Sequence, residues 1–234
     1  MKSINQVTII IPCYNEIKFL EMITQKVLDN KIENKQVIII DDFSTDGTRE
    51  LLLNKIEPMV DKVIYHERNM GKGACIRSAI KFIKGDIVII QDADLEYDPS
   101  DHKNLVKVME ENNADVVYGS RVSKENKNNL NLYIANRVAN FILTAITNFF
   151  TGLKITDMET GLKCFKKKAI ENVSLCENGF GFEPEITIKL AKKKLKFEET
   201  GVKYNPRTIS EGKKIRTYDG IIALLCILKY SLKS

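Results

Sequence analysis

The chain has 234 residues, of which 44% are hydrophobic and 29% charged, and these ordinary globular values exclude disordered and fibrous classes. Its length can bury a substantial core and suits one α/β domain. The net charge of +5 arises late in the chain, because residues 189–216 hold ten Lys or Arg against three Glu. Five scattered cysteines and two histidines indicate neither a disulfide framework nor a zinc site, so we expect free thiols in a reducing cytosol.

Short β-branched runs alternate with helical patterns through the first half of the chain. Predicted strands cover residues 7–11, 37–40, 63–65, 86–90 and 115–118. Predicted helices cover residues 17–29, 49–55, 74–82 and 100–111. This alternation predicts right-handed crossovers and a mostly parallel, Rossmann-like sheet flanked by helices, with its ligand crevice at the carboxyl ends of the strands.

The second half of the chain does not continue this regular alternation of strands and helices. We predict helices over 132–150, 183–194 and 218–232, an edge strand over 162–165, a strand over 197–204, and polar basic loops over 123–131 and 207–216. The longest apolar stretch, residues 130–153, is interrupted by Arg137 and by asparagines, so we expect no transmembrane helix. The N-terminus shows no signal-peptide pattern, and we therefore expect no export.

Two carboxylates, Asp92 and Asp94, close the apolar run 87–90. Side chains two apart on an extended strand point the same way, so both can converge on one ion. Hard oxygen ligands suit Mg²⁺ or Mn²⁺, with positions left for water and a diphosphate. Taken alone, an Asp-x-Asp is more often a turn or a helix cap. However, polar clusters at 12–16, 41–42 and 68–73 lie at the ends of other predicted strands. We expect all of these clusters to face one crevice, and this shared position favours a nucleotide and metal site.

Four ordered motifs carry a family resemblance: Ile11-Pro12-Cys13-Tyr14-Asn15-Glu16, Asp41-Asp42-Phe43-Ser44-Thr45-Asp46-Gly47-Thr48, Asn69-Met70-Gly71-Lys72-Gly73 and Asp92-Ala93-Asp94-Leu95-Glu96-Tyr97-Asp98-Pro99. Together they resemble family 2 glycosyltransferases of the GT-A fold, most of all the dolichol- and polyprenyl-phosphate hexosyltransferases. Segments 119–121, 157–161 and 207–213 extend the likeness. The resemblance implies one GT-A domain over 1–234, with a nucleotide-sugar and metal half (1–121) and an acceptor half (122–234) that ends in a helical extension.

The resemblance, weighed with side-chain chemistry, assigns the donor site to the first half. Nucleotide-sugar binding is expected from Pro12, Tyr14, Glu16, Asp41, Lys72 and Asp92. The metal ligands are expected to be Asp92, Asp94 and Glu96. A Walker-type NTPase is not expected, because Gly71-Lys72-Gly73 lacks the first glycine and the hydroxyl residue of a P-loop. Asn15 and Asp42 are interpreted as turn and cap residues.

The same resemblance implies an acceptor site built on basic side chains. Binding of an acceptor phosphate is expected from Arg121, Arg137, Arg207 and Lys213, because a guanidinium offers paired donors that match phosphate oxygens. Catalytic roles are expected for Asp94, Arg121, Asp157 and Arg207. A lipid-phosphate oxygen is already anionic and needs no strong base, so catalysis becomes alignment and charge neutralisation. For a hydroxyl acceptor, the base would be Asp157 or Glu159.

The resemblance thus implies an inverting hexosyltransferase that uses Mg²⁺ or Mn²⁺ and moves a hexose from UDP- or GDP-hexose to a polyprenyl phosphate. We expect peripheral contact with the inner, cytoplasmic face of the membrane through the basic segment 189–216 and the terminal helix, and no nucleic-acid partner. A transferase acting on a saccharide hydroxyl during cell-surface polysaccharide synthesis stays open. So does a non-catalytic nucleotide-binding regulatory domain. The sugar also stays open, because Ser210-Glu211-Gly212-Lys213 departs from the Gly-Glu-Ser-Lys of many dolichol-phosphate-mannose relatives.

Overall fold

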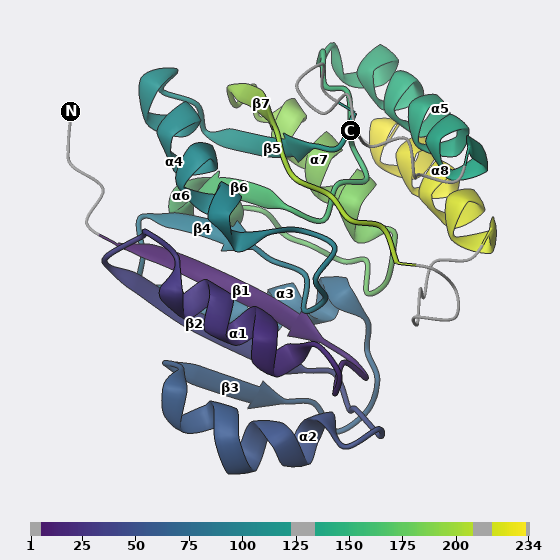
Figure 1. Ribbon diagram of the computed structural model, residues 1–234. Helices are drawn as coiled ribbons and strands as arrows, with labels where there is room; N and C mark the ends of the chain where they lie inside the picture. Colours follow the sequence, from purple (N-terminus) through teal and green to yellow (C-terminus); the bar gives the residue numbers. More distant parts are fainter. Residues whose placement is uncertain (1–5, 123–133, 208–216, 233–234) are drawn as a thin grey trace.

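The computed structural model describes residues 6–122, 134–207 and 217–232 (Figure 1). The described strands form one seven-stranded sheet in the order β3-β2-β1-β4-β6-β5-β7. They are β1 Val7–Cys13, β2 Lys35–Asp41, β3 Lys62–Tyr65, β4 Ile87–Ile90, β5 Val116–Ser120, β6 Lys163–Lys166 and β7 Phe197–Gly201. Neighbouring strands pair in parallel except that β6 runs antiparallel to both β4 and β5. The predicted mostly parallel α/β sheet is confirmed.

The connections between strands are helical, as the periodicity predicted. The α-helices are α1 Leu20–Asp29, α2 Thr48–Leu51, α3 Lys72–Ile80, α4 His102–Glu111, α5 Ile134–Thr151, α6 Lys167–Glu171, α7 Phe182–Lys192 and α8 Thr217–Leu232. A π-helical turn, Leu52–Ile56, continues α2, and 3-10 turns cover Glu57–Met59 and Pro99–Asp101. The predicted polar loops over 123–131 and most of 207–216 lie outside the described residues.

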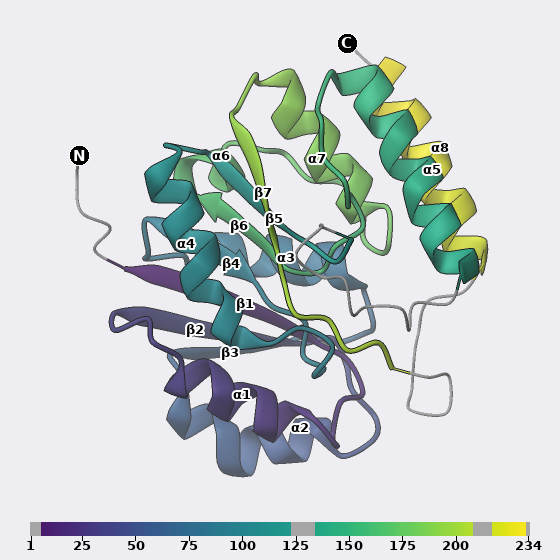
Figure 2. The ribbon, with the colours of Figure 1, turned by 45° about the horizontal axis from the view of Figure 1, so that its top comes forward.

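Alternation along the strands divides the core between the two faces of the sheet. Ile9 and Ile11 point to the face covered by α1 and α4. Ile10, between them, points to the opposite face, where α3 and α7 pack and the outer pair α5 and α8 completes the layer. In Figure 2, α1 and α2 lie on one side of β1 to β3, and α3 lies on the other. Polar loops are thereby left at the carboxyl ends of the parallel strands.

The expectation of an edge strand at 162–165 is wrong. Strand β6 lies inside the sheet, between β4 and β5, and Leu162, Cys164 and Phe165 are fully buried. Lys163 of this strand is also buried, and its ammonium donates to the carbonyls of Met158 and Thr160. Strand β7 occupies that edge instead and ends at Gly201, short of the predicted 204.

Helices α5 and α8 lie side by side on the outside of the molecule, in both views (Figures 1 and 2). Each exposes large apolar side chains, including Phe141 (71% exposed) and Phe149 (83%) on α5, and Leu225 (60%) and Leu232 (73%) on α8. Among the helices that the structure describes, none is long and apolar enough to cross a membrane.

Candidate active site

A cavity of about 660 Å³ opens at the carboxyl ends of the parallel strands. Nine of the predicted site residues line it, and they come from both halves of the chain: Pro12, Tyr14, Glu16, Lys72, Asp92, Asp94, Glu96, Arg121 and Arg207. Pro12 is the penultimate residue of β1, and Tyr14 and Glu16 follow that strand. Lys72 begins α3, the acidic residues at 92–96 follow β4, Arg121 follows β5 and Arg207 lies beyond β7. The structure therefore brings together motifs that the sequence separates by up to 195 residues, from position 12 to 207.

The acidic wall of this cavity contains the predicted metal ligands. Burial raises the pKa of Asp94 to about 7, and the neighbouring carboxylates of Asp92 and Glu96 add to that effect. The Asp92 Oδ1 atom forms an ion pair with Lys72 Nζ at 2.8 Å. Clustered carboxylate oxygens are a donor set that a hard divalent cation would stabilise, so Asp92, Asp94 and Glu96 fit Mg²⁺ or Mn²⁺.

The guanidinium of Arg207 bridges the same acidic wall. It lies 2.9 Å from Glu16 Oε2, 2.5 Å from Asp94 Oδ2 and 3.6 Å from Glu96 Oε1. The phenol of Tyr204 donates to Glu96 Oε2 at 2.7 Å. Arg207 was predicted to bind the acceptor phosphate, but here it neutralises the carboxylates that would hold the cation. A bound metal and Arg207 would therefore compete for the same oxygens.

We expect Arg207→Gln to raise the affinity for Mn²⁺ by about 10-fold in the absence of nucleotide, because it removes a cation that neutralises Asp94 and Glu96. Titration calorimetry of wild type and variant with Mn²⁺ alone measures the change. Arg49→Gln is the matched control, because Arg49 pairs at 2.7 Å with Asp41, which does not line the cavity. Equal or weaker Mn²⁺ binding by the Arg207 variant would contradict the competition.

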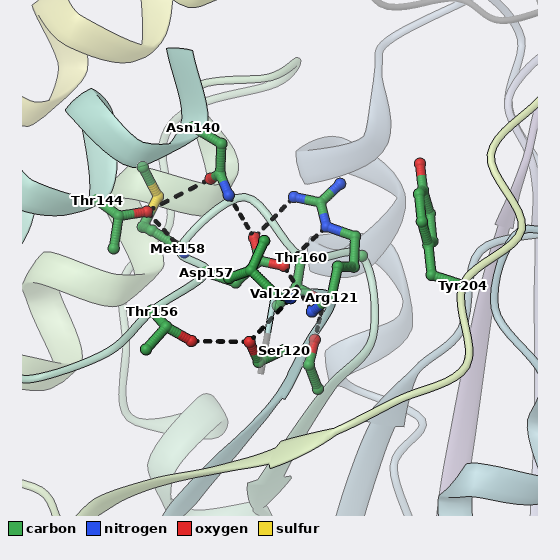
Figure 3. A network of polar contacts seen from close by, with 12 residues as sticks. Ser120, Arg121, Val122, Asn140, Thr144, Thr156, Asp157, Met158, Thr160 and Tyr204 are labelled. Atoms are coloured by element: carbon green, nitrogen blue, oxygen red, sulfur yellow. Dashed lines mark hydrogen bonds and ion pairs between the residues drawn. The ribbon is translucent and has the colours of Figure 1, made fainter. Parts of the chain in front are cut away.

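Arg121, which lines the cavity, is held by an ion pair with the buried Asp157 (Figure 3). Arg121 donates from Nε and from one terminal nitrogen to the two carboxylate oxygens, both at 2.7 Å. Asn140 of α5 donates to the same carboxylate at 2.9 Å, and the Arg121 guanidinium lies 5.3 Å from the centre of the Tyr204 ring. Asp157 is fully buried behind Arg121 and does not line the cavity. Its geometry is that of a residue that orients Arg121.

Three other predicted residues lie elsewhere. Asp41 is fully buried, with one oxygen paired to Arg49 and the other accepting from the Ser44 N–H, so the structure does not bring it into the cavity. Arg137 lines a second hollow of about 390 Å³ on the α5 side. Lys213 lies outside the described residues.

Comparisons with known proteins agree with this geometry. The model of the family described as glycosyl transferase family 2 matches residues 8–174. The chain belongs to this family. The glycosyltransferase is 27% identical to UDP-N-acetylglucosamine–dolichyl-phosphate N-acetylglucosaminyltransferase of Methanococcus voltae, over 94% of this chain and 95% of that enzyme. It is 25% identical to undecaprenyl-phosphate 4-deoxy-4-formamido-L-arabinose transferase of Photorhabdus laumondii, over 84% of this chain but 60% of that one.

Solved structures confirm the GT-A fold of the glycosyltransferase. Glucosyl-3-phosphoglycerate synthase of Mycobacterium tuberculosis, in complex with Mn²⁺, UDP and phosphoglyceric acid, matches with a TM-score of 0.71 at 16% identity, over 97% of this chain and 78% of that chain. A mannosyltransferase of Pyrobaculum calidifontis, in complex with GDP-Man and Mn²⁺, matches with a TM-score of 0.61 at 22% identity, over 83% of this chain and 54% of that chain.

Several cavity residues of the glycosyltransferase were missed or given another role by sequence reasoning. Asp42 lines the cavity, and its carboxylate accepts from the backbone N–H groups of Met70 and Gly71, which fixes the loop before α3. Tyr204 and Glu183 also line it. Glu183 carried no sequence signal beyond its place at the start of a helix, whereas the paired aspartates at the end of β2 could have indicated Asp42.

Gly161 leaves room for the Asp92 carboxylate in the acidic wall of the cavity, because a Cβ built at Gly161 would collide with Asp92 Oδ2. We expect Gly161→Ala to displace that carboxylate and to lower kcat/KM about 10²-fold, as small misplacements in an active site do. Initial rates over a Mn²⁺ series measure the effect. Gly220→Ala is the control, since a Cβ at Gly220 on α8 meets nothing within 4 Å. A fully active Gly161 variant would show that Asp92 tolerates the shift.

Proposed function

We propose that this glycosyltransferase moves a hexose from UDP- or GDP-hexose to a polyprenyl phosphate, with Mg²⁺ or Mn²⁺ as cofactor and with inversion. The observation that carries the proposal is that the acidic wall and Arg121 share one cavity. An acidic wall suits a metal–diphosphate complex, and an anchored guanidinium suits a phosphate monoester. The dolichyl-phosphate and undecaprenyl-phosphate in the names of two relatives support the same class of acceptor.

In this reaction the protein aligns two charged substrates. Asp92, Asp94 and Glu96 would hold the divalent cation, which when bound neutralises charge developing on the departing nucleoside diphosphate. Arg121, fixed by Asp157, would bind the acceptor phosphate and direct one of its oxygens to the anomeric carbon. That oxygen is already anionic, so the attack needs no deprotonation. A single displacement of this kind inverts the anomeric configuration.

A transferase acting on a saccharide hydroxyl is the second candidate, and Glu159 favours it. This side chain lines the cavity, and burial together with the charge of Glu183 raises the pKa of Glu159 to about 8. A carboxylate with a raised pKa is a suitable general base for a hydroxyl acceptor. Asp157, the other base considered from the sequence, is already saturated by Arg121 and Asn140.

The two candidates are separated by a transfer assay. Purified protein is incubated with Mn²⁺, a panel of radiolabelled sugar nucleotides, and either a short polyprenyl phosphate or an oligosaccharide. We expect label in the organic-phase lipid product with at least one donor. Label only in the oligosaccharide would establish the hydroxyl acceptor, and transfer to neither acceptor would count against both candidates.

We further propose that the enzyme acts as a peripheral protein at the cytoplasmic face of a membrane. The exposed apolar side chains of α5 and α8 support this, together with exposed Lys192, Lys193 and Lys194 and five free cysteines that suit a reducing compartment.

We expect salt-sensitive binding to anionic liposomes, because each lysine near an anionic surface contributes roughly 1 kcal/mol that salt screens. Sedimentation with anionic and neutral liposomes across a salt series measures it. Equal partitioning to both kinds of liposome, or to neither, would favour the saccharide acceptor.

A further inference from the structure

The floor of the cavity carries two glutamates that the transfer to a lipid phosphate leaves unused. Glu183, the second residue of α7, is 4% exposed, and Glu159 lies in the loop before β6. Both line the cavity. Within the described part of the chain, the Oε2 atom of Glu183 and the Oε1 atom of Glu159 are shielded from solvent and have no hydrogen-bond partner. Buried acceptors are seldom left unpaired, so these two oxygens call for donors supplied by a ligand.

The position of these oxygens identifies the part of the ligand that would reach them. Lys72 Nζ lies 2.8 Å from Asp92 Oδ1 and 3.1 Å from Glu183 Oε1, and thus joins the metal-binding wall to the floor. In a nucleotide sugar the hexose is attached to the diphosphate through its anomeric carbon. A diphosphate held at Asp92 and Asp94 would therefore leave the ring of the hexose within reach of Lys72 and the two glutamates.

We propose that Glu183 and Glu159 are specificity-determining residues that accept hydrogen bonds from ring hydroxyl groups of the donor hexose. The inference rests on the proposed nucleotide-sugar donor and goes beyond it by assigning its recognition. The Glu183 carboxylate, which pairs with Lys72, is only an acceptor and therefore selects donor groups, a hydroxyl or an amide N–H. The carboxyl group of Glu159 can accept from such a group in either protonation state. A sugar that lacks the matching hydroxyl leaves a buried oxygen unpaired, which is how a polar site rejects such an analogue.

The experiment uses Glu183→Gln and calorimetry with Mn²⁺. UDP-glucose, UDP-N-acetylglucosamine and GDP-mannose are titrated first, and the tightest binder is then compared with its 2-, 3-, 4- and 6-deoxy forms and with its free nucleoside diphosphate. In the wild type, we expect loss of one hydroxyl to weaken binding about 10- to 100-fold, the range for a hydrogen bond to a charged group. In Glu183→Gln that penalty should fall at least threefold, while the affinity for the nucleoside diphosphate stays within twofold.

Glu185→Gln is the matched control. Glu185 lies on the same helix and is fully buried, but its oxygens accept from the backbone N–H groups of Cys176 and Glu177 and pair with Lys189. This variant should lose stability and keep the wild-type penalties. If Glu183→Gln does not fold, Glu159→Gln is measured instead. We expect the same smaller deoxy-sugar penalty and the same unchanged affinity for the nucleoside diphosphate.

Two results overturn the inference. Unchanged deoxy penalties in the glutamate variant, or an equal loss of affinity for sugar nucleotide and free diphosphate, would make Glu183 only a counter-ion of Lys72. Failure of all three sugar nucleotides to bind the wild type would instead refute the proposed donor, and the inference with it.

Discussion

Asp94→Asn is expected to lower turnover by at least about 10²-fold, which is about 3 kcal/mol of transition-state stabilisation. Asp94 lies in the acidic wall with its pKa raised to about 7 by burial and by Asp92 and Glu96. An amide keeps the shape of the side chain but loses the charge that would hold the cation at the donor diphosphate. Initial rates at saturating sugar nucleotide, with a Mn²⁺ titration for each protein, measure the loss.

Two comparisons make this expectation specific. Excess EDTA should abolish wild-type turnover, and added Mn²⁺ should restore it. Asp98→Asn is the matched control, because the carboxylate of Asp98 caps the following 3-10 turn by accepting from Ser100 N at 2.9 Å and does not line the cavity. Full activity in EDTA, or equal losses in both variants, would refute the role of Asp94 in cation binding.

Arg121→Met is expected to lower the free energy of unfolding by about 3–5 kcal/mol at neutral pH, because it leaves the buried carboxylate of Asp157 without its charged partner. It should also abolish transfer to a polyprenyl phosphate while nucleotide binding persists, since Arg121 lines the cavity and is the residue proposed to bind the acceptor phosphate. Urea denaturation followed by circular dichroism measures the first effect. Lys107→Met, which breaks an exposed helical pair with Glu111, should change stability by no more than about 0.5 kcal/mol.

The same pair predicts a pH dependence of stability. Burial by itself raises the pKa of Asp157, but the adjacent Arg121 guanidinium reverses this and holds the pKa below its ordinary value of 3.8. A carboxyl group whose pKa is lower in the folded protein stabilises the fold at pH values above its pKa in the unfolded chain. This stabilisation is lost as the pH falls through the pKa of the folded protein. Arg121→Met removes the largest of the effects that oppose burial, so the carboxyl group of Asp157 takes up a proton more readily. The stability gap between wild type and variant should therefore be largest near neutral pH and shrink as the pH falls from the variant's higher pKa to the depressed pKa of the wild type; a constant gap would contradict this.

The sequence by itself determined the parallel strands and the residues that end them. Runs such as Ile9-Ile10-Ile11 are β-branched and too short for a helix, and the helices between them follow from periodicity, so both are properties of local sequence. Parallel strands all end at one edge of the sheet, which is why Glu16, Lys72 and Asp94 could be expected in one crevice before any coordinates.

The place of β6 was decided only by the tertiary structure. Insertion of an antiparallel strand between β4 and β5 depends on pairing between distant segments, which local pattern does not specify. The interior position of this strand also buries Lys163, and a buried ammonium is costly unless it finds acceptors. The carbonyls of Met158 and Thr160 supply them, and Lys163 Nζ also lies 4.6 Å from the centre of the Tyr118 ring.

The partners of the charged side chains were likewise decided by the tertiary structure. Both aspartates at the end of β2 matched the family motif, yet Arg49 saturates Asp41 while Asp42 lines the cavity. Arg207 pairs with Glu16, a residue 191 positions away, and Glu183 meets Lys72 across the floor. Charges over such separations come together only when the sheet and its helices are assembled, because their partners are chosen by packing and burial.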